Sequence, residues 1–177
     1  MTTEHSAPAT STTTSATPKA GPLTREQLAT MSGLEILRHM QAAAEAAAES
    51  GAELPPSIGR LLGMRVSRVD EGEVEFTLDT VPDFANPLGQ THGGICATLL
   101  DSALGCAVHT TLDAGVGYGT LEMKLNYVRS VPTDGTTLRA VGHVVHSGRS
   151  TAIAEGSVFD DQDRLVAHGT ETCLIYR

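Results

Sequence analysis

A short turn near the middle of the chain leads directly into an apolar run. The turn contains Asn86 and ends in His92-Gly93-Gly94, and the run from Ile95 to Leu112 carries a single acid, Asp101. The first amides of a helix lack acceptors within the helix and carry the positive end of its dipole. Glycines at this point let another group approach the backbone closely. The turn is therefore a candidate site for an anion, or for an oxygen that becomes negative during acyl transfer.

Asp101 is a candidate nucleophile or general base for such a reaction. The residues that share its side of a helix are mostly small and uncharged, whereas a solvated helix face usually carries more charge. The alternative is that Asp101 faces solvent or pairs with a neighbour. Residue types alone leave both interpretations open.

The spacing between the glycines and the acid has a geometric consequence. Asp101 lies seven or eight residues beyond them, which is about 10 to 12 Å along a helix axis. One helix therefore cannot hold a carbonyl at its own N-terminus and attack it with its own Asp101. Two antiparallel helices related by a two-fold axis could do so, because each Asp101 would face the partner's Gly93-Gly94 end. If Asp101 is catalytic, the sequence predicts a homodimer with two shared sites.

The first part of the chain divides into a tail and a helical extension. Residues 1–22 consist mainly of Thr, Ser, Ala and Pro, so we expect a disordered tail that cannot bury enough surface to order itself. Residues 23–53 begin with Thr24 and Gln27 at capping-box spacing. Apolar residues then recur at near-helical intervals, which predicts one helix or two helices divided near Ser32-Gly33.

Residues 54–177 are expected to form the main domain, with mostly strand around one helix. Apolar and polar residues alternate in several runs, and Glu71-Gly72 and Asp134-Gly135 mark turns between them. The longest run ends at Pro132 and contains four alternating apolar residues: Leu121, Met123, Leu125 and Tyr127. One central helix and about six strands predict an α+β fold, in which the helix packs against a curved antiparallel sheet.

Composition narrows the classes of partner. Twelve Lys and Arg against 21 Asp and Glu give a net charge of -9, which argues against non-specific binding of nucleic acid. No apolar run approaches the roughly 18 to 20 residues of a membrane span, and no signal peptide is recognisable. We therefore expect a soluble cytoplasmic protein that binds neither nucleic acid nor membrane.

Three weaker motifs are better explained by structure than by chemistry. The glycines of residues 115–119 follow a predicted helix and precede a strand, which is the reverse of a nucleotide-binding loop. His143 and His146 lie three apart on a predicted strand and so point to opposite faces, which disfavours a metal pair. The run from Asp160 to Asp163 lacks the glycine and distal glutamate of a calcium loop and predicts a solvated hairpin turn. No metal site is expected.

Three segments carry a family resemblance: NPLGQTHGGICATLLDSALGCA, YGTLEMKLNYVRSVP and SGRSTAIAEGSVFDDQDRLVAHGTETCLI. They resemble the PaaI-like branch of the hotdog-fold acyl-CoA thioesterases over about Pro55 to Ile175. The resemblance implies a hotdog fold, with a long helix wrapped by an antiparallel sheet. It also implies hydrolysis of an acyl-CoA to a carboxylic acid and CoA without a cofactor, in a homodimer or homotetramer.

The resemblance assigns catalytic roles to five residues. Asp101 matches the acid that attacks the thioester carbonyl or activates water, and Gly93 matches the glycine whose N–H polarises that carbonyl. Asn86 and His92 match the pair that orients the thioester and the lytic water, from the subunit opposite Asp101. Thr120 falls where relatives often have a Ser or Thr that assists placement of the water or of the acid.

The resemblance also implies that a second set of residues binds substrate or coenzyme A. Gly94 adjoins the carbonyl site, and the CoA phosphates are expected near the basic residues Arg129 and Arg149. Several of the implied site residues also have simpler explanations. The arginines could be ordinary strand-end charges, His92 could cap the turn through the backbone, and Asn86 before proline could be a turn residue.

Two other functions fit parts of the sequence. One is a module that binds acyl-CoA, or a partner through residues 23–50, without turnover. The other is an enoyl-CoA hydratase of the same fold, whose signature places Asp and His a few residues apart, whereas His92 precedes Asp101 by nine residues. Release of a thiol from acyl-CoA separates the thioesterase from both. The sequence leaves open whether the acyl group is aromatic or aliphatic.

Overall fold

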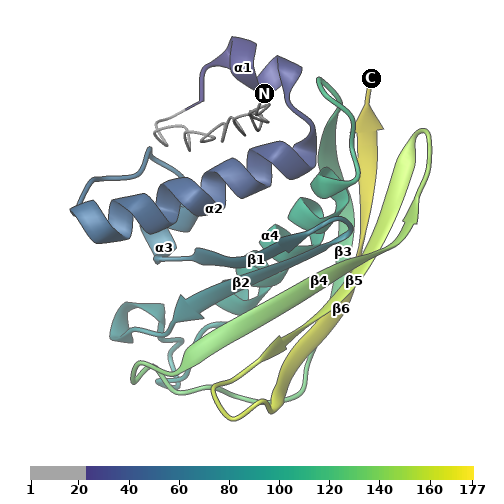
Figure 1. Ribbon diagram of the computed structural model, residues 1–177. Coiled ribbons are helices and arrows are strands. Elements are labelled where there is room, and N and C mark those ends of the chain that lie inside the picture. Colours follow the sequence, from purple (N-terminus) through teal and green to yellow (C-terminus); the bar gives the residue numbers. More distant parts are fainter. Residues whose placement is uncertain (1–22) are drawn as a thin grey trace, which may run out of the picture.

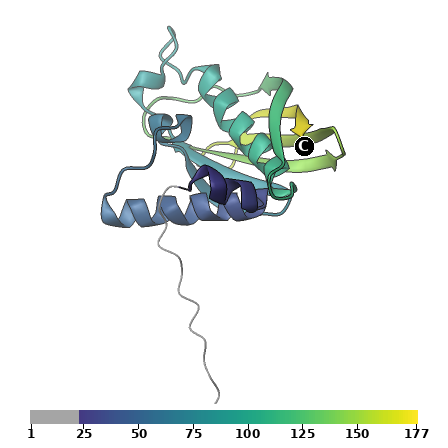
Figure 2. The ribbon, with the colours of Figure 1, turned by 90° about the horizontal axis from the view of Figure 1, so that it is seen from above.

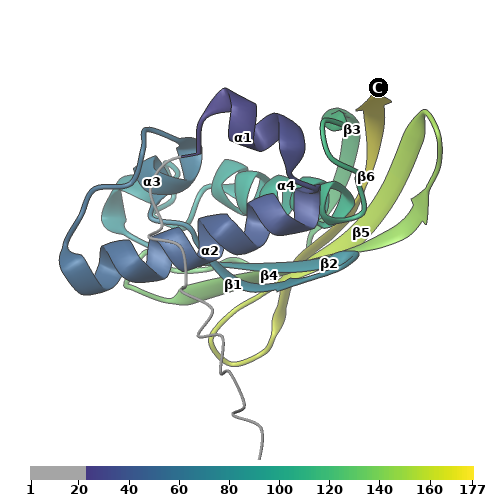
Figure 3. The same ribbon diagram turned by 45° about the horizontal axis from the view of Figure 1, so that its top comes forward.

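The computed structural model describes residues 23–177, so the predicted tail at residues 1–22 lies outside the described residues. The sheet curves around one long helix, α4, and a second long helix, α2, lies beside β1 (Figures 1 and 3). The elements follow the order α1 (Arg25–Thr30), α2 (Gly33–Ser50), α3 (Ile58–Leu62), β1 (Arg65–Asp70), β2 (Glu73–Asp79), η1 (Pro82–Phe84), α4 (Gly93–Thr110), β3 (Gly117–Tyr127), β4 (Thr137–Ser147), β5 (Thr151–Phe159) and β6 (Leu165–Tyr176).

The six strands form one antiparallel sheet in the order β1-β2-β4-β5-β6-β3. The predicted hairpin turn is present between β1 and β2, where Gly72 has a φ of +77°. The strict alternation of β2 buries Val74, Phe76 and Leu78 against the helix side of the sheet. The predicted α+β class, with one central helix on a six-stranded antiparallel sheet, is confirmed.

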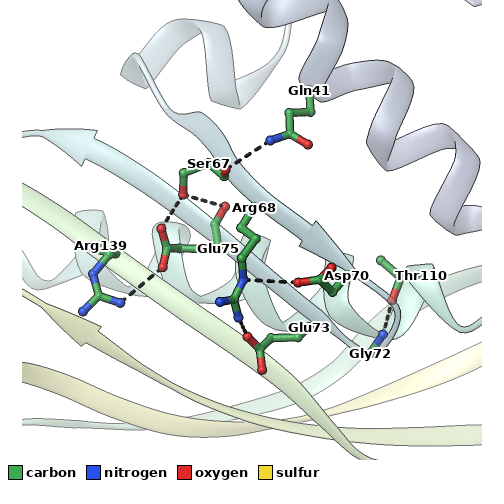
Figure 4. Close-up of polar contacts among 9 residues, drawn as sticks. All are labelled: Gln41, Ser67, Arg68, Asp70, Gly72, Glu73, Glu75, Thr110 and Arg139. Atoms are coloured by element: carbon green, nitrogen blue, oxygen red, sulfur yellow. Dashed lines mark hydrogen bonds and ion pairs between the residues drawn. The ribbon is translucent and has the colours of Figure 1, made fainter.

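Helix α4 is buried around much of its circumference, which explains why its sequence is apolar rather than clearly amphipathic. Its buried residues are Cys96, Leu99, Leu100, Ala103, Leu104, Gly105, Ala107, Val108 and Thr110. The hairpin between β1 and β2 is tied to the C-terminal end of this helix, since the Gly72 amide donates to Thr110 Oγ1 at 2.7 Å (Figure 4). The sheet and the first hairpin thus fix the position of α4.

A row of three glycines lets α4 lie directly against the sheet. Gly142, Gly156 and Gly169 are cross-strand neighbours on β4, β5 and β6. A Cβ at Gly142 would lie 2.6 Å from the backbone carbonyl of Ala103, and a Cβ at Gly156 would lie 2.9 Å from the side chain of Leu104. Side chains at the first two positions would therefore collide with α4.

The predicted helical extension contains two helices that separate at Ser32, the N-cap of α2. The first turn of α2 meets the end of α4 (Figure 2). There the Gly33 amide donates to the Leu112 carbonyl at 3.0 Å, and a Cβ at Gly33 would collide with the backbone of His109. Leu37, one turn further along, is only 1% exposed. Helix α2 is therefore packed into the domain.

The outer side of β1 and β2 carries a network of polar residues (Figure 4). Ser67 Oγ donates to Glu75 Oε1 at 2.6 Å, and Arg139 Nη1 of β4 lies 3.2 Å from Glu75 Oε2. Gln41 of α2 reaches the same strand, because its Nε2 donates to the Ser67 carbonyl at 3.1 Å. The polar residues that alternate with the core residues of β2 thus pair on its outer surface.

No helix within residues 23–177 is long and apolar enough to cross a membrane.

Candidate active site

The first turn of α4 borders a pocket of about 410 Å³. The turn before this helix and the end of β3 also line the pocket. Three of the predicted site residues, Asn86, Gly93 and Arg129, line this pocket. Tyr127 lines it as well and donates a hydrogen bond from its hydroxyl to the Gly93 carbonyl at 2.9 Å. A Cβ at Gly93 would lie 3.1 Å from the Tyr127 ring, so the ring and the helix start pack closely.

The two glycine amides at the start of α4 differ in their hydrogen bonding. The Gly94 amide donates to His92 Nδ1 at 2.9 Å. Within the described part of the chain, the Gly93 amide has no acceptor. The helix start therefore offers a ligand the N–H of Gly93, whereas the predicted binding residue Gly94 has its amide engaged.

His92 is the N-cap of α4 and combines a structural contact with an available nitrogen. Its Nδ1 accepts from Gly94, as the simpler explanation of this histidine predicted. In the neutral ring the proton then lies on Nε2, which can donate. The side chain is exposed beside the start of the helix, so His92 can cap the turn and still donate to a ligand.

Asn86 likewise uses only part of its side chain to stabilise the turn. Its Oδ1 accepts from the amides of Leu88 at 2.9 Å and Gln90 at 3.2 Å. The turn role is therefore present in the structure. The Nδ2 group makes no hydrogen bond with residues 23–177, and it remains a donor at the wall of the pocket.

A buried cysteine in the same pocket is unsuited to be a nucleophile. Cys96 lines the pocket one turn along α4 and is 4% exposed. Burial raises the pKa of the Cys96 thiol to about 11. The group is therefore a neutral thiol near pH 7, whereas the nucleophilic form is the thiolate.

Asp101 is half-buried and pairs with the predicted Thr120. Thr120 Oγ1 lies 3.2 Å from Asp101 Oδ1, with the hydroxyl as donor. This contact fixes one oxygen of the carboxylate. Asp101 lies eight residues beyond Gly93 on α4, or about 12 Å along the axis. Within one chain, the Gly93 amide and the Asp101 carboxylate are therefore too far apart to act on the same carbonyl group.

A β-bulge in β3 brings Thr120 to the helix side of the sheet. Thr120 pairs with Cys173 and Glu122 pairs with Thr172, so Leu121 is an extra residue between the two pairs. Strict alternation would place Thr120 on the face opposite Met123. The bulge instead puts both on the helix face. Strand β3 ends at Tyr127, and the segment up to Pro132 that was predicted to continue it is not strand.

The structure adds a residue that the sequence predictions did not include. Glu171 of β6 is 0% exposed, and its Oε1 lies within hydrogen-bond distance of Thr120 Oγ1, at 3.0 Å. Burial raises the pKa of Glu171, and the neighbouring charge of Asp101 adds to this effect. A sequence signal existed, because Glu171 alternates with Gly169 and Cys173 on a face that is otherwise small or apolar.

The two predicted CoA-binding arginines lie at opposite ends of β6. Arg129 Nε donates to the Leu165 carbonyl at the start of this strand at 3.3 Å. The Arg149 carbonyl accepts from Arg177 Nε, just beyond the end of the strand, at 3.2 Å. Twelve residues of strand span about 35 Å. One chain therefore brings Arg129, but not Arg149, to the pocket at Gly93.

Comparison with known proteins places this chain in a family. Residues 88–167 match the model of the thioesterase superfamily. A protein of Halobacterium salinarum that carries the provisional name esterase is 31% identical over 118 residues, which cover 64% of this chain and 76% of that protein.

Two solved structures have the same architecture. The E. coli PaaI protein from the phenylacetic acid degradation operon superposes with a TM-score of 0.65 and 22% identity, over 76% of this chain and 91% of that chain. A hypothetical thioesterase of Streptococcus pneumoniae, solved with coenzyme A, has a TM-score of 0.59 and 26% identity, over 64% of this chain and 85% of that chain. The chain therefore belongs to the thioesterase superfamily and has its hotdog fold, as the sequence resemblance implied.

Proposed function

We propose that the protein hydrolyses an acyl-CoA thioester to a carboxylic acid and coenzyme A, at sites shared by two subunits. The observation that carries this proposal is the open amide of Gly93 at the positive end of α4, in a pocket with Asn86 and Arg129. The relative solved with coenzyme A supports the choice of substrate class. Superfamily membership supports hydrolysis.

The thioester oxygen would accept a hydrogen bond from the Gly93 amide. Negative charge develops on this oxygen in the transition state, and the helix dipole and the amide favour that charge. One such donor contributes about 100- to 1000-fold to kcat in other acyl-transfer enzymes. Asn86 Nδ2 and His92 Nε2 are further donors that can orient the thioester and the attacking water. Arg129 would contact the phosphates of coenzyme A.

Asp101 of the opposite subunit would then act on the carbonyl carbon. It either attacks directly, which expels the CoA thiolate and leaves a mixed anhydride for water to hydrolyse, or it takes the proton of an attacking water. In both routes the thiolate leaves as CoA-SH after it gains a proton. Thr120 holds Asp101 Oδ1, which leaves the other oxygen for the reaction.

The outer edge of β3 supports a dimer. Strand β3 lies at the end of the sheet and pairs only with β6 among the described strands. Leu121 and Tyr127 of this strand are 57% and 53% exposed, and Val128 just beyond its end is 55% exposed. A long edge strand with large apolar side chains is a template for pairing. Association through β3 would also place two α4 helices near a common two-fold axis, and assembly into a tetramer stays a prediction.

Release of free thiol from a panel of acyl-CoAs tests the activity. The panel should include phenylacetyl, hydroxybenzoyl, and short and medium straight-chain acyl groups, and Asp101→Asn is the matched variant. We expect wild type to hydrolyse at least one substrate and Asp101→Asn to lose at least about 100-fold. If neither protein releases thiol from any member of the panel, the thioesterase proposal fails.

Mixing two inactive variants tests the shared site. Asn86→Asp keeps the oxygen that caps the turn but removes the Nδ2 donor, so it isolates the proposed role in binding. In a mixed dimer with Asp101→Asn, one site combines an intact Asn86 with an intact Asp101 from the other chain. Random reassociation makes half of the dimers mixed, and each has one intact site of two, so about one quarter of wild-type activity should return. No recovery would place both residues in the same subunit's site.

A further inference from the structure

A second carboxyl group lies behind the proposed catalytic acid, within the layer between sheet and helix. Glu171 is fully buried. Its Oε1 lies 3.0 Å from Thr120 Oγ1 and 3.0 Å from Cys173 Sγ. Its Oε2 is buried and has no partner in the part of the chain that the structure describes. A buried carboxylate with an unpartnered oxygen would be costly, because an unpaired charge is poorly solvated away from water.

The Thr120 hydroxyl links this group to Asp101. It lies within hydrogen-bond distance of both carboxyl groups, at 3.2 Å from Asp101 and 3.0 Å from Glu171. A hydroxyl has one hydrogen to donate and an oxygen that can accept. It therefore satisfies both groups only if one of them donates to it in return. A protonated Glu171 would donate to Thr120, and the Thr120 hydrogen would then be free for Asp101.

The surroundings of Glu171 disfavour a second negative charge. The titratable groups that interact with it are Asp101 and Cys106 of α4, Tyr118 of β3 and Cys173 of β6. All four are acids. A neighbouring negative charge disfavours ionisation of a carboxyl group, and so does burial away from water. Both act on Glu171, and burial, the larger cause, raises its pKa.

We propose that Glu171 holds a proton and acts as a positioning residue, donating to Thr120 so that the Thr120 hydroxyl donates to Asp101. This role rests on the proposed function of Asp101 as the reacting acid. When Glu171 loses its proton, the Thr120 hydroxyl turns toward the buried charge. Asp101 then loses its only hydrogen-bond donor among residues 23–177. Activity should therefore fall as Glu171 ionises.

The protonation of Glu171 is tested first by stability, which needs no substrate. Unfolded Glu171 has the ordinary Glu pKa of 4.5, and the folded value is higher. The folded state therefore binds more protons between these two pKa values, and Glu171 loses its stabilising contribution as the pH rises through this window. Glu171→Gln cannot ionise. The stability of Glu171→Gln relative to wild type should therefore increase with pH above about 4.5.

The measurement is urea unfolding of both proteins from pH 4 to pH 9. Glu122→Gln is the matched control, because Glu122 is an exposed glutamate on the neighbouring strand. We expect a pH-dependent gap for Glu171→Gln that exceeds that of the control. A gap that stays constant with pH, or one that shrinks as the pH rises, overturns the proposal.

The positioning role is tested by the pH profile of kcat/KM. Wild type should lose activity on the alkaline side as Glu171 ionises, and Glu171→Gln should lack that limb. On the acid side of that limb, Glu171→Leu, which cannot donate, should lose up to about tenfold relative to wild type, the equivalent of one hydrogen bond. Glu171→Gln should recover most of that loss, because its amide still donates to Thr120.

The outcomes separate this proposal from the proposed function. If wild type releases no thiol from any acyl-CoA, the function fails, while the unfolding experiment still decides whether Glu171 is protonated. If wild type is active and Glu171→Gln keeps the alkaline limb, another group causes the limb and the positioning role is wrong. If Gln is as inactive as Leu, the charged form of Glu171 is required and the proposal is again overturned.

Discussion

Gly142→Ala tests whether the close contact between α4 and the sheet sets the geometry of the candidate site. The added Cβ would lie 2.6 Å from the carbonyl of Ala103, whereas ordinary van der Waals contact begins at 3.4 Å. Helix α4 must therefore move by about 1 Å or the strand must bend. Extra atoms in a packed core cost about 1 to 3 kcal/mol. We expect the free energy of unfolding to fall by this amount.

The same substitution should also reduce activity, because Ala103 is two residues from Asp101. A displacement of about 1 Å can lower the rate about 100-fold when it misaligns a reacting group. Urea unfolding and thiol release measure the two effects on the same preparation. Gly59→Ala is the matched control, since a Cβ there has no neighbour closer than 3.8 Å. If Gly142→Ala matches this control in stability, the glycine row does not hold α4 against the sheet, and the reasoning is refuted.

Three further changes test separate features. Thr120→Val should lower kcat/KM at least about tenfold while Thr120→Ser keeps most activity, since the hydroxyl supplies one hydrogen bond to the acid; equal losses in thiol-release assays would contradict this. Leu37→Ala should destabilise by about 2 to 5 kcal/mol in urea, whereas the exposed Met40→Ala should cost much less; equal small effects would mean that α2 does not dock. Burial raises the pKa of Asp160, but hydrogen bonds from Arg164 and Gln162, together with the Arg164 charge, outweigh it and leave that pKa below 3.8. Asp160→Asn should therefore destabilise at pH 7, and the difference in unfolding free energy should vanish as the pH falls below the folded pKa; a difference that persists in acid would contradict this origin.

Periodicity predicted the parts of the fold in which local pattern and burial agree. Strand β2 alternates without interruption, and Val74, Phe76 and Leu78 are all buried. The sequence left open one N-terminal helix or two divided near Ser32-Gly33, and the structure has two, with Ser32 as the N-cap of α2. Both features depend on neighbours in sequence, so a single sequence is enough to recognise them.

The edge strand β3 shows where such a pattern stops being sufficient. Its apolar residues alternate from Leu121 onward, yet the bulge at Leu121 moves Thr120 onto the same face as Met123. Nothing in the local pattern marks this extra residue, because a bulge depends on how the partner strand is paired. The family resemblance alone implied that Thr120 helps to place Asp101. In the structure their contact results from the register of β3 against β6.

In the candidate site, too, features set by nearby residues were predictable, whereas contacts between residues far apart in the sequence were not. The open amide of Gly93 was predictable because helix starts have a local signature, and its distance from Asp101 followed from the rise of the same helix. The partnership of Thr120 with Glu171 joins residues 51 positions apart and depends on cross-strand pairing. Burial then separates the two acids: Asp101 is half-buried and within reach of a ligand, while burial raises the pKa of the enclosed Glu171 and favours its protonated form. Two carboxyl groups of similar intrinsic acidity thus acquire different proposed roles from their depth in the fold.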